Sequence, residues 1–265
     1  MDYLNYGKQV QQQPKKPQPQ GFGNQVQLTK DDFSFGNLNQ QTTQPQVEPQ
    51  TKDQLLQLFP IPLLICPCPF EYGKELEWIK KQSYRRENKN TDTVSSLNRQ
   101  TDDTFILDKP EMSRVRQFID SKIKIFADDI MGSDNEMVIT QSWLNKNGKG
   151  ESHHEHMHPN SMISGVWYPQ INEKLPPIQF RNSQQRDITL SIKNYDHFNS
   201  ATFLLPMRKG ELILFPSNLS HSVPANQSDE ERISLSFNTW CVGSLGDIKS
   251  LTYLPLEGKG LPVIK

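Results

Sequence analysis

Cysteine is scarce in this sequence of 265 residues, and its scarcity limits the class of protein. Cys66, Cys68 and Cys241 are too few to form the disulfide framework of a small secreted domain. Cys66 and Cys68 could bind zinc, but no second close pair completes a four-ligand site, so we interpret them as small residues of a strand and loop. The expected setting is reducing and intracellular, in the cytoplasm.

The sequence also lacks an excess of charge of one sign and any long apolar run. It has 29 basic and 30 acidic residues, so no basic surface for nucleic acid is indicated. No stretch of about 18 apolar residues could span a membrane, and the N-terminal segment "MDYLNYGKQVQQQPKK" has no apolar core of a signal peptide. We therefore expect neither nucleic acid nor a membrane as partner, and the composition does not specify an oligomeric state.

Two regions of different composition follow one another along the chain. Residues 1–50 contain thirteen glutamines and five prolines but few aliphatic residues. Such a segment buries too little apolar surface to offset the entropy lost on ordering. We therefore predict a disordered Gln/Pro-rich tail over residues 1–55 and one folded domain over residues 56–265.

The folded region begins with helical patterns and continues with short strands. Apolar spacing predicts a short helix within 71–85 and a longer one within 109–132, while Pro60 and Pro62 indicate an edge strand. Six short segments rich in β-branched and aromatic residues are predicted strands: 137–145, 161–169, 176–182, 201–207, 210–216 and 232–240. The expected fold is mainly β with supporting α-helices, in one domain with helices packed on a β-sandwich or barrel.

A cluster of histidines lies between the first two of these strands, in "GESHHEHMHPNS". Side chains at positions i and i+2 of a strand project to the same face. An extended backbone would therefore place His154, His156 and His158 on one side, and His153 and Glu155 on the other. Two histidines at this spacing can occupy adjacent positions around one metal ion, so the cluster predicts a metal site.

A third ligand must come from a distant strand, and the two remaining histidines are His197 and His221. His221 follows the apolar strand 210–216 in "KGELILFPSNLSHSV" and begins the next extended segment. A histidine at such a junction suits a site between two sheets, so we predict His221 as the third ligand. His197 lies in the polar segment "IKNYDHFNS" and is predicted to be a solvated loop residue.

A second candidate site follows in the strand "RISLSFN". Arg232 and Ser234 share one face of this strand, and apolar residues occupy the other. An arginine on the inner face of a β-sandwich needs an anionic partner, because an unpaired buried charge is costly. Arginine binds a carboxylate through two parallel hydrogen bonds, and a serine hydroxyl can add a third. The sequence thus predicts a carboxylate site beside the metal site.

Together, these segments resemble the iron(II)/2-oxoglutarate-dependent oxygenases, over about residues 57–243. The similarity is greatest to a branch frequent in bacteriophage and bacterial sequences, with the pattern H-x-H-x-N-S-x-x-S-G-V-x-Y. In this chain the pattern runs from His156 to Tyr168. The resemblance implies a double-stranded β-helix, the jelly roll of cupins, and an oxidoreductase activity that consumes 2-oxoglutarate.

The resemblance also implies roles for particular residues. His156, His158 and His221 would bind Fe(II), and Arg232 with Ser234 would hold the distal carboxylate of the cosubstrate 2-oxoglutarate. Ascorbate is a further candidate cofactor. The implied reaction is hydroxylation of an unactivated C–H of a peptidyl residue, an amino acid or a small metabolite, with release of succinate and CO2.

One position departs from the family's usual two histidines and one carboxylate, because His158 stands where the acid is expected. The nearby pair His153 and Glu155 has the usual chemistry and is an alternative to His156 and His158. Two other functions remain open. A cupin-like metalloprotein would explain three histidines but leave Arg232 without a partner. A jelly roll that serves only as an interaction scaffold would leave both sites unused.

Overall fold

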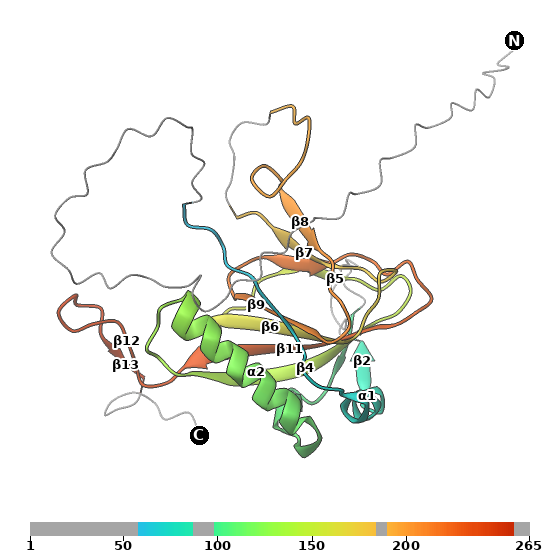
Figure 1. The fold of residues 1–265 in the computed structure, drawn as a ribbon, viewed down its shortest axis with the longest axis horizontal. Coiled ribbons are helices and arrows are strands. Elements are labelled where there is room, and N and C mark those ends of the chain that lie inside the picture. Colours follow the sequence, from blue (N-terminus) through green and yellow to red (C-terminus); the bar gives the residue numbers. More distant parts are fainter. Residues whose placement is uncertain (1–57, 87–97, 184–189, 257–265) are drawn as a thin grey trace, which may run out of the picture. The chain divides into compact units, whose positions relative to one another are not determined.

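The computed structural model describes residues 58–86, 98–183 and 190–256 of the chain, drawn in colour in Figure 1. All of them belong to one compact unit, Gln54–Lys265. The predicted Gln/Pro-rich tail over residues 1–55 lies outside the described residues. Within the described ranges, the structure contains no helix that is long and apolar enough to cross a membrane.

Two antiparallel sheets form most of this unit. The strands of the seven-stranded sheet are, in spatial order, β1 (Leu64–Pro67), β9 (Glu211–Pro216), β6 (Ile163–Gln170), β11 (Arg232–Cys241), β4 (Met137–Asn147), β3 (Arg99–Thr101) and β2 (Tyr84–Arg86). Those of the four-stranded sheet are β5 (His153–His156), β10 (His221–Val223), β7 (Ile178–Arg181) and β8 (Thr202–Leu205). A separate pair is formed by β12 (Ser244–Leu245) and β13 (Leu254–Pro255).

The connectivity of β4 to β11 is that of a jelly roll. Strands that follow one another along the chain cross between the two sheets at every step except β7 to β8, which form a hairpin. The resulting orders, β9-β6-β11-β4 and β5-β10-β7-β8, define an eight-stranded double-stranded β-helix. The fold class predicted from the sequence is therefore confirmed.

Helices cover the outer face of the seven-stranded sheet, where α2 (Ser113–Ile125) lies across the strands in Figure 1. Its buried residues pack with the outward apolar residues of β11 in one core: Val115, Phe118, Ile119, Ile123, Ile233, Leu235 and Phe237. The predicted longer helix is confirmed; it is preceded by the 3-10 turns η2 (Ile106–Asp108) and η3 (Pro110–Met112) and continues into the π turn η4 (Phe126–Ile130). The predicted shorter helix is α1 (Gly73–Lys80).

A second apolar core lies between the two sheets, but it covers only part of their inner faces. It contains residues from β6, β7 and β9: Val166, Tyr168, Ile178, Phe180, Ile213 and Phe215. The inward positions of β4 and β11 are instead polar, as at Asn145, Asn147, Arg232 and Ser234, which are all buried. The interior of the jelly roll therefore has one apolar wall and one polar wall.

The predicted edge strand is present, but it begins later than the prolines suggested. Pro60 and Pro62 precede β1, which pairs only with β9 at one edge of the seven-stranded sheet. Proline lacks the backbone N–H that a strand ladder needs, so regular pairing starts only at Leu64. Cys66 lies in this strand and is buried, as a small strand residue would be.

Gly165 provides a test of the packing between the strands and the helical face. A Cβ at this position would come within 2.7 Å of Leu214 Cδ2 and would also overlap the ring of Phe237. Gly165→Ala is expected to lower the free energy of unfolding by about 1–3 kcal/mol because the core is overpacked. Urea denaturation measures the change. Gly73→Ala is the control, since a Cβ there meets nothing within 4 Å, and an equal effect at both sites would contradict the packing argument.

Candidate metal centre

The pairing of β10 with β5 brings the distant histidines together. His221, the first residue of β10, lies directly opposite His156, the last residue of β5. His158 follows two residues beyond β5, and its backbone N–H donates to Ser217 O at 3.0 Å, which holds it beside the turn before β10. One nitrogen from each of the three imidazoles lies within 4.8 Å of the other two.

Hydrogen bonds orient two of these imidazoles for metal binding. The Nδ1 atom of His156 lies 2.8 Å from His154 O, and that of His221 lies 2.9 Å from Leu219 O. A carbonyl can only accept, so each Nδ1 carries the proton and each Nε2 keeps a free lone pair. His158 Nε2 lies 3.2 Å from His221 Nε2, a separation that suits two ligands of one ion at about 2.0–2.1 Å from each nitrogen.

Burial keeps the three imidazoles neutral at ordinary pH. Desolvation, reinforced by the neighbouring His156, lowers the pKa of His158 to about 4 and that of His221 to about 3. The pKa of His156 is lowered as well, first by burial. Metal ions bind the neutral imidazole, so these ligands are ready for a cation without first losing protons.

A chain of hydroxyl groups holds the loop after the histidines in place. Ser217 Oγ donates to Ser161 Oγ at 2.7 Å and lies 2.8 Å from Ser164 Oγ. Ser164 Oγ in turn lies 3.1 Å from Asn238 Oδ1 on β11. The two serines of the sequence pattern thus tie the loop that carries His158 to β11 and to the turn that leads to His221.

A β-bulge changes the predicted faces of the histidine cluster. His156 is three positions after His153 on β5, but Val223 is only two positions after His221 on β10. The expectation that His153 and His156 lie on opposite faces is therefore wrong: their rings lie 4.4 Å apart, centre to centre. His154, predicted to share the face of His156, is exposed and is not part of the three-histidine group.

Glu155, the alternative acidic ligand, lies on the outer side of the sheet. Its carboxylate accepts two hydrogen bonds from Arg181 Nε, at 2.6 and 2.7 Å, and one from Ser220 Oγ at 2.9 Å. The three-histidine group found among the described residues includes no carboxylate. His197 is exposed, as predicted for a loop residue, and its ring packs on Phe198.

Arg232 lies on the polar wall of the same interior and is 2% exposed. Its Nη1 donates to Asn147 Oδ1 and Ser234 Oγ, both at 3.2 Å, and its guanidinium stacks over the Tyr168 ring. No carboxylate pairs with it among the described residues, and its Nε atom is buried without a hydrogen-bond partner. Burial lowers the pKa of Arg232. This guanidinium therefore lacks the anion that its burial calls for.

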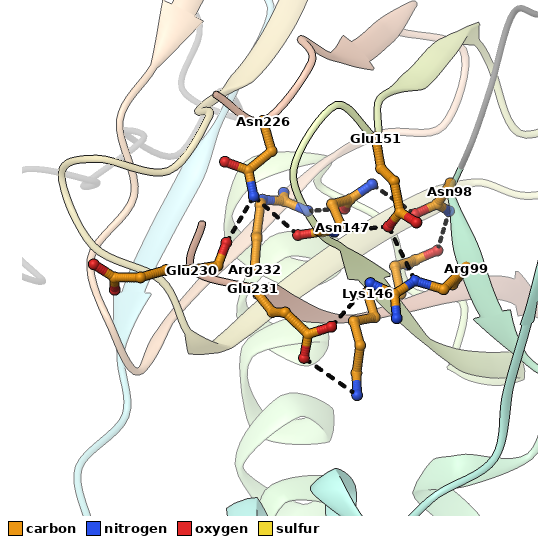
Figure 2. A network of polar contacts seen from close by, with 11 residues as sticks. Asn98, Arg99, Lys146, Asn147, Glu151, Asn226, Glu230, Glu231 and Arg232 are labelled. Atoms are coloured by element: carbon orange, nitrogen blue, oxygen red, sulfur yellow. Dashed lines mark hydrogen bonds and ion pairs between the residues drawn. The ribbon is translucent and has the colours of Figure 1, made fainter. Parts of the chain in front are cut away.

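A ladder of buried amides supports Arg232 from behind, as Figure 2 shows. Asn147 Nδ2 donates to Asn98 Oδ1, and Asn98 Nδ2 donates to Asn145 Oδ1, both at 2.9 Å. Asn226 holds the backbone of Asn147 through a hydrogen bond of 3.1 Å from Nδ2 to its carbonyl. These residues were not predicted from the sequence, although Asn145 and Asn147 share one strand face and could have indicated a polar wall.

Ion pairs close the end of the interior beside this ladder (Figure 2). Arg99 donates to Glu151 Oε2 at 3.0 Å and to Glu231 Oε1 at 2.9 Å, and Lys146 lies 3.6 Å from Glu231. Glu151 also accepts from the backbone N–H of Gly148 at 2.7 Å. The carboxylates of Glu151 and Glu231 are therefore engaged with other cations and not with Arg232.

A surface groove of about 490 Å³ lies beside β7 and β8 of the four-stranded sheet. Its apolar lining comes from Phe180 and Leu219, from Phe203 on β8, from the loop residue Phe198, and from residues 58–61 and 63. Phe180 also contacts the ring of His221, at 6.1 Å between centres. The groove thus presents mainly apolar side chains next to one of the three histidines.

Fold and geometry together define a jelly-roll protein with a three-histidine metal centre candidate and a buried arginine in one interior. Residues 141–238 match the model of a family described as "Putative 2OG-Fe(II) oxygenase". The match runs from β4 to β11, the strands of the jelly roll, and agrees with the resemblance to the iron(II)/2-oxoglutarate-dependent oxygenases seen in the sequence. No curated protein matches the chain.

Solved structures of low sequence identity match the chain over about two thirds of its length. A 2OG-Fe(II) oxygenase family oxidoreductase from Burkholderia pseudomallei is 13% identical, with a TM-score of 0.47 over 67% of this chain and 83% of that one. A prolyl-4-hydroxylase from Pseudomonas putida is 10% identical, with a TM-score of 0.47 over 68% and 92% of the respective chains.

Substitution of single ligands tests the composition of the centre. His156→Ala or His221→Ala is expected to weaken metal binding more than about 100-fold, because losing a ligand costs more than losing a supporting partner. Glu155→Ala should leave the affinity within about twofold, since its carboxylate pairs with Arg181 on the outer side. Calorimetric titration with Co(II) measures each affinity. If Glu155→Ala abolished metal binding and His158→Ala did not, His153 and Glu155 would be the ligands in place of His156 and His158.

The depressed pKa values predict an unusually weak effect of acid on metal binding. Two histidines of ordinary pKa, about 6.5, would together lose about 100-fold in affinity between pH 7.5 and 5.5, because protons compete with the metal. His158 and His221, with pKa values of about 4 and 3, bind few protons in this range. The affinity for Zn(II) should therefore fall less than about tenfold, as measured by competition with a chelator at each pH.

Proposed function

We propose that this protein is an iron(II)- and 2-oxoglutarate-dependent dioxygenase. In this proposal His156, His158 and His221 bind the metal, and Arg232 with Ser234 binds the distal carboxylate of 2-oxoglutarate. The observation that carries it is the fully buried guanidinium without an anion, in the same interior as three converging neutral imidazoles. The match of residues 141–238 to the oxygenase family model supports the proposal.

The donor set fits an iron(II) ion. Imidazole nitrogen is a suitable ligand for iron, and three neutral ligands leave coordination positions open for a chelating anion. When bound, iron would supply the activation of oxygen that couples oxidative decarboxylation of 2-oxoglutarate, to succinate and CO2, to oxidation of the substrate. The protein holds three imidazoles in fixed orientations through His154 O, Leu219 O and the hydroxyl chain.

The polar wall fits a carboxylate. Arg232 presents an unpartnered Nε, and the hydroxyl group of Tyr168 beneath it is also buried without a partner. A carboxylate accepts paired hydrogen bonds from a guanidinium and further bonds from hydroxyl groups. Arg232, Ser234 and Tyr168 would together satisfy such a ligand, and the amide ladder fixes the guanidinium so that little side-chain entropy is lost on binding.

The apolar groove beside His221 supports a substrate with an apolar portion near the C–H to be hydroxylated. Phe180, Phe198 and Phe203 line it and would exclude water from that portion. Peptidyl residues, amino acids and small metabolites all include members of this kind. Succinate release, measured with each class in turn by the iron-loaded protein, identifies the substrate.

A cupin-like metalloprotein that does not use 2-oxoglutarate is the second candidate, and the three-histidine set favours it. Such a protein has no use for Arg232, which this function would leave as a buried cation without a partner. The two candidates therefore differ in one measurable property, the affinity of the metal-loaded protein for 2-oxoglutarate.

Variants of Arg232 and Ser234 test the cosubstrate site. Arg232→Lys replaces a planar fork with a point charge and should weaken 2-oxoglutarate binding about 10- to 100-fold. Arg232→Ala should cost more, and Ser234→Ala less, because a neutral hydrogen bond is weaker. The measurement is the charge-transfer absorption that forms when 2-oxoglutarate is titrated into the iron(II) protein without oxygen. An unchanged titration with Arg232→Ala would favour the cupin-like function.

A further inference from the structure

Trp143 presents an unused hydrogen-bond donor beside the metal centre. It lies on β4, where it shares the inward face with Asn145 and Asn147, and its ring centre lies 5.8 Å from that of His158. Its indole Nε1 is buried and has no hydrogen-bond partner. A buried donor left unpaired costs about 1–3 kcal/mol, so its retention requires an explanation.

Three of the four unpartnered buried polar side-chain atoms of the described residues lie in the interior of the jelly roll. The four atoms are Glu75 Oε2, Trp143 Nε1, Tyr168 Oη and Arg232 Nε. Glu75 lies on α1 and pairs with Arg114 through its other oxygen. The remaining three are all donors that line the interior of the jelly roll. An interior with three free donors matches a ligand with several acceptor oxygens.

The strand register places these donors at two ends of the polar wall. Arg232 lies opposite Asn147, and Ser236, four residues further along β11, lies opposite Trp143. Four residues of strand span about 13 Å, so the two backbones are well apart along the wall. The long side chain of Arg232 extends over Tyr168, while the ring of Trp143 lies next to His158. The wall therefore offers donors at a distal end and at a metal end.

We propose that Trp143 binds the cosubstrate, donating from its indole N–H to the oxoacid end of 2-oxoglutarate, while Arg232 holds the distal carboxylate. This inference rests on the proposed function, because it needs a dicarboxylate between the histidines and Arg232. It assigns one donor to each end of a ligand that carries acceptor oxygens at both ends. Trp143 would then fix which oxygens of the oxoacid face the metal.

Comparing 2-oxoglutarate with pyruvate tests the roles of Trp143 and Arg232 separately. Pyruvate has the same oxoacid group as 2-oxoglutarate but no distal carboxylate. Trp143→Phe keeps an aromatic ring next to His158 and removes only the N–H, so it should weaken both ligands by a similar factor, about tenfold, as expected for a hydrogen bond to a charged group. Arg232→Ala should weaken 2-oxoglutarate strongly and leave pyruvate nearly unchanged. Anaerobic titration of the iron(II) protein, followed by charge-transfer absorption, measures all four affinities.

The controls keep the outcomes distinct. Trp78→Phe, on α1 and away from this interior, should change neither ligand. Co(II) affinity of Trp143→Phe within about twofold of wild type shows that the metal centre is intact. If the wild-type protein binds no 2-oxoglutarate, the proposed function fails. If it binds 2-oxoglutarate and Trp143→Phe changes neither ligand, only the inference about Trp143 is overturned.

A measurement on the unaltered protein provides a second test. The chain has four tryptophans, so 15N-labelled protein gives few indole N–H signals, and loss of one in Trp143→Phe assigns it. With diamagnetic Zn(II) in the site, 2-oxoglutarate should move this signal downfield and slow its exchange with solvent, and pyruvate should do the same. A signal that responds to neither ligand overturns the inference, as does one that responds only to substrate.

Discussion

The antiparallel ladder between β5 and β10 is the interaction on which the candidate site depends. It aligns His156 with His221 across 65 positions of sequence, and the second edge of β10 is held by β7. The strand has only three residues, so its place is set by its two neighbours and not by its own length. Because His156 and His221 both belong to this ladder, their convergence requires that the four-stranded sheet has formed.

The interior that contains these imidazoles has a polar wall and an apolar wall, because side chains alternate between the two faces of each strand. Alternate residues of β4 and β11 turn amides, hydroxyls and Arg232 inward and send apolar side chains out to the helices. The neighbouring strands β6 and β9 are apolar on both faces, as expected for strands covered on both sides. A ligand held between the walls meets hydrogen-bond donors on one side only, which orients it without any movement of the protein.

The parts of this site that follow from simple periodicity could be predicted from the sequence. The inward position of Arg232 and Ser234 follows from alternation along one regular strand. The faces of His153 and His154 could not be predicted, because a bulge between paired strands depends on the partner and leaves no mark in "SHHEH". Asn98 and Tyr168 were missed for a related reason: their roles arise from contacts with residues more than 40 positions away.

The absence of an acid from the three-histidine group has a thermodynamic consequence for the proposed holoprotein. Without ligands, the interior holds one positive charge at Arg232, with which no carboxylate of the described residues pairs. A divalent cation adds to this positive charge, whereas a dicarboxylate dianion offsets two of the three positive charges. Metal and dicarboxylate are therefore linked, and each raises the affinity of the other by the same factor. In the proposed holoprotein, the metal would therefore be held more tightly when the dicarboxylate is also bound.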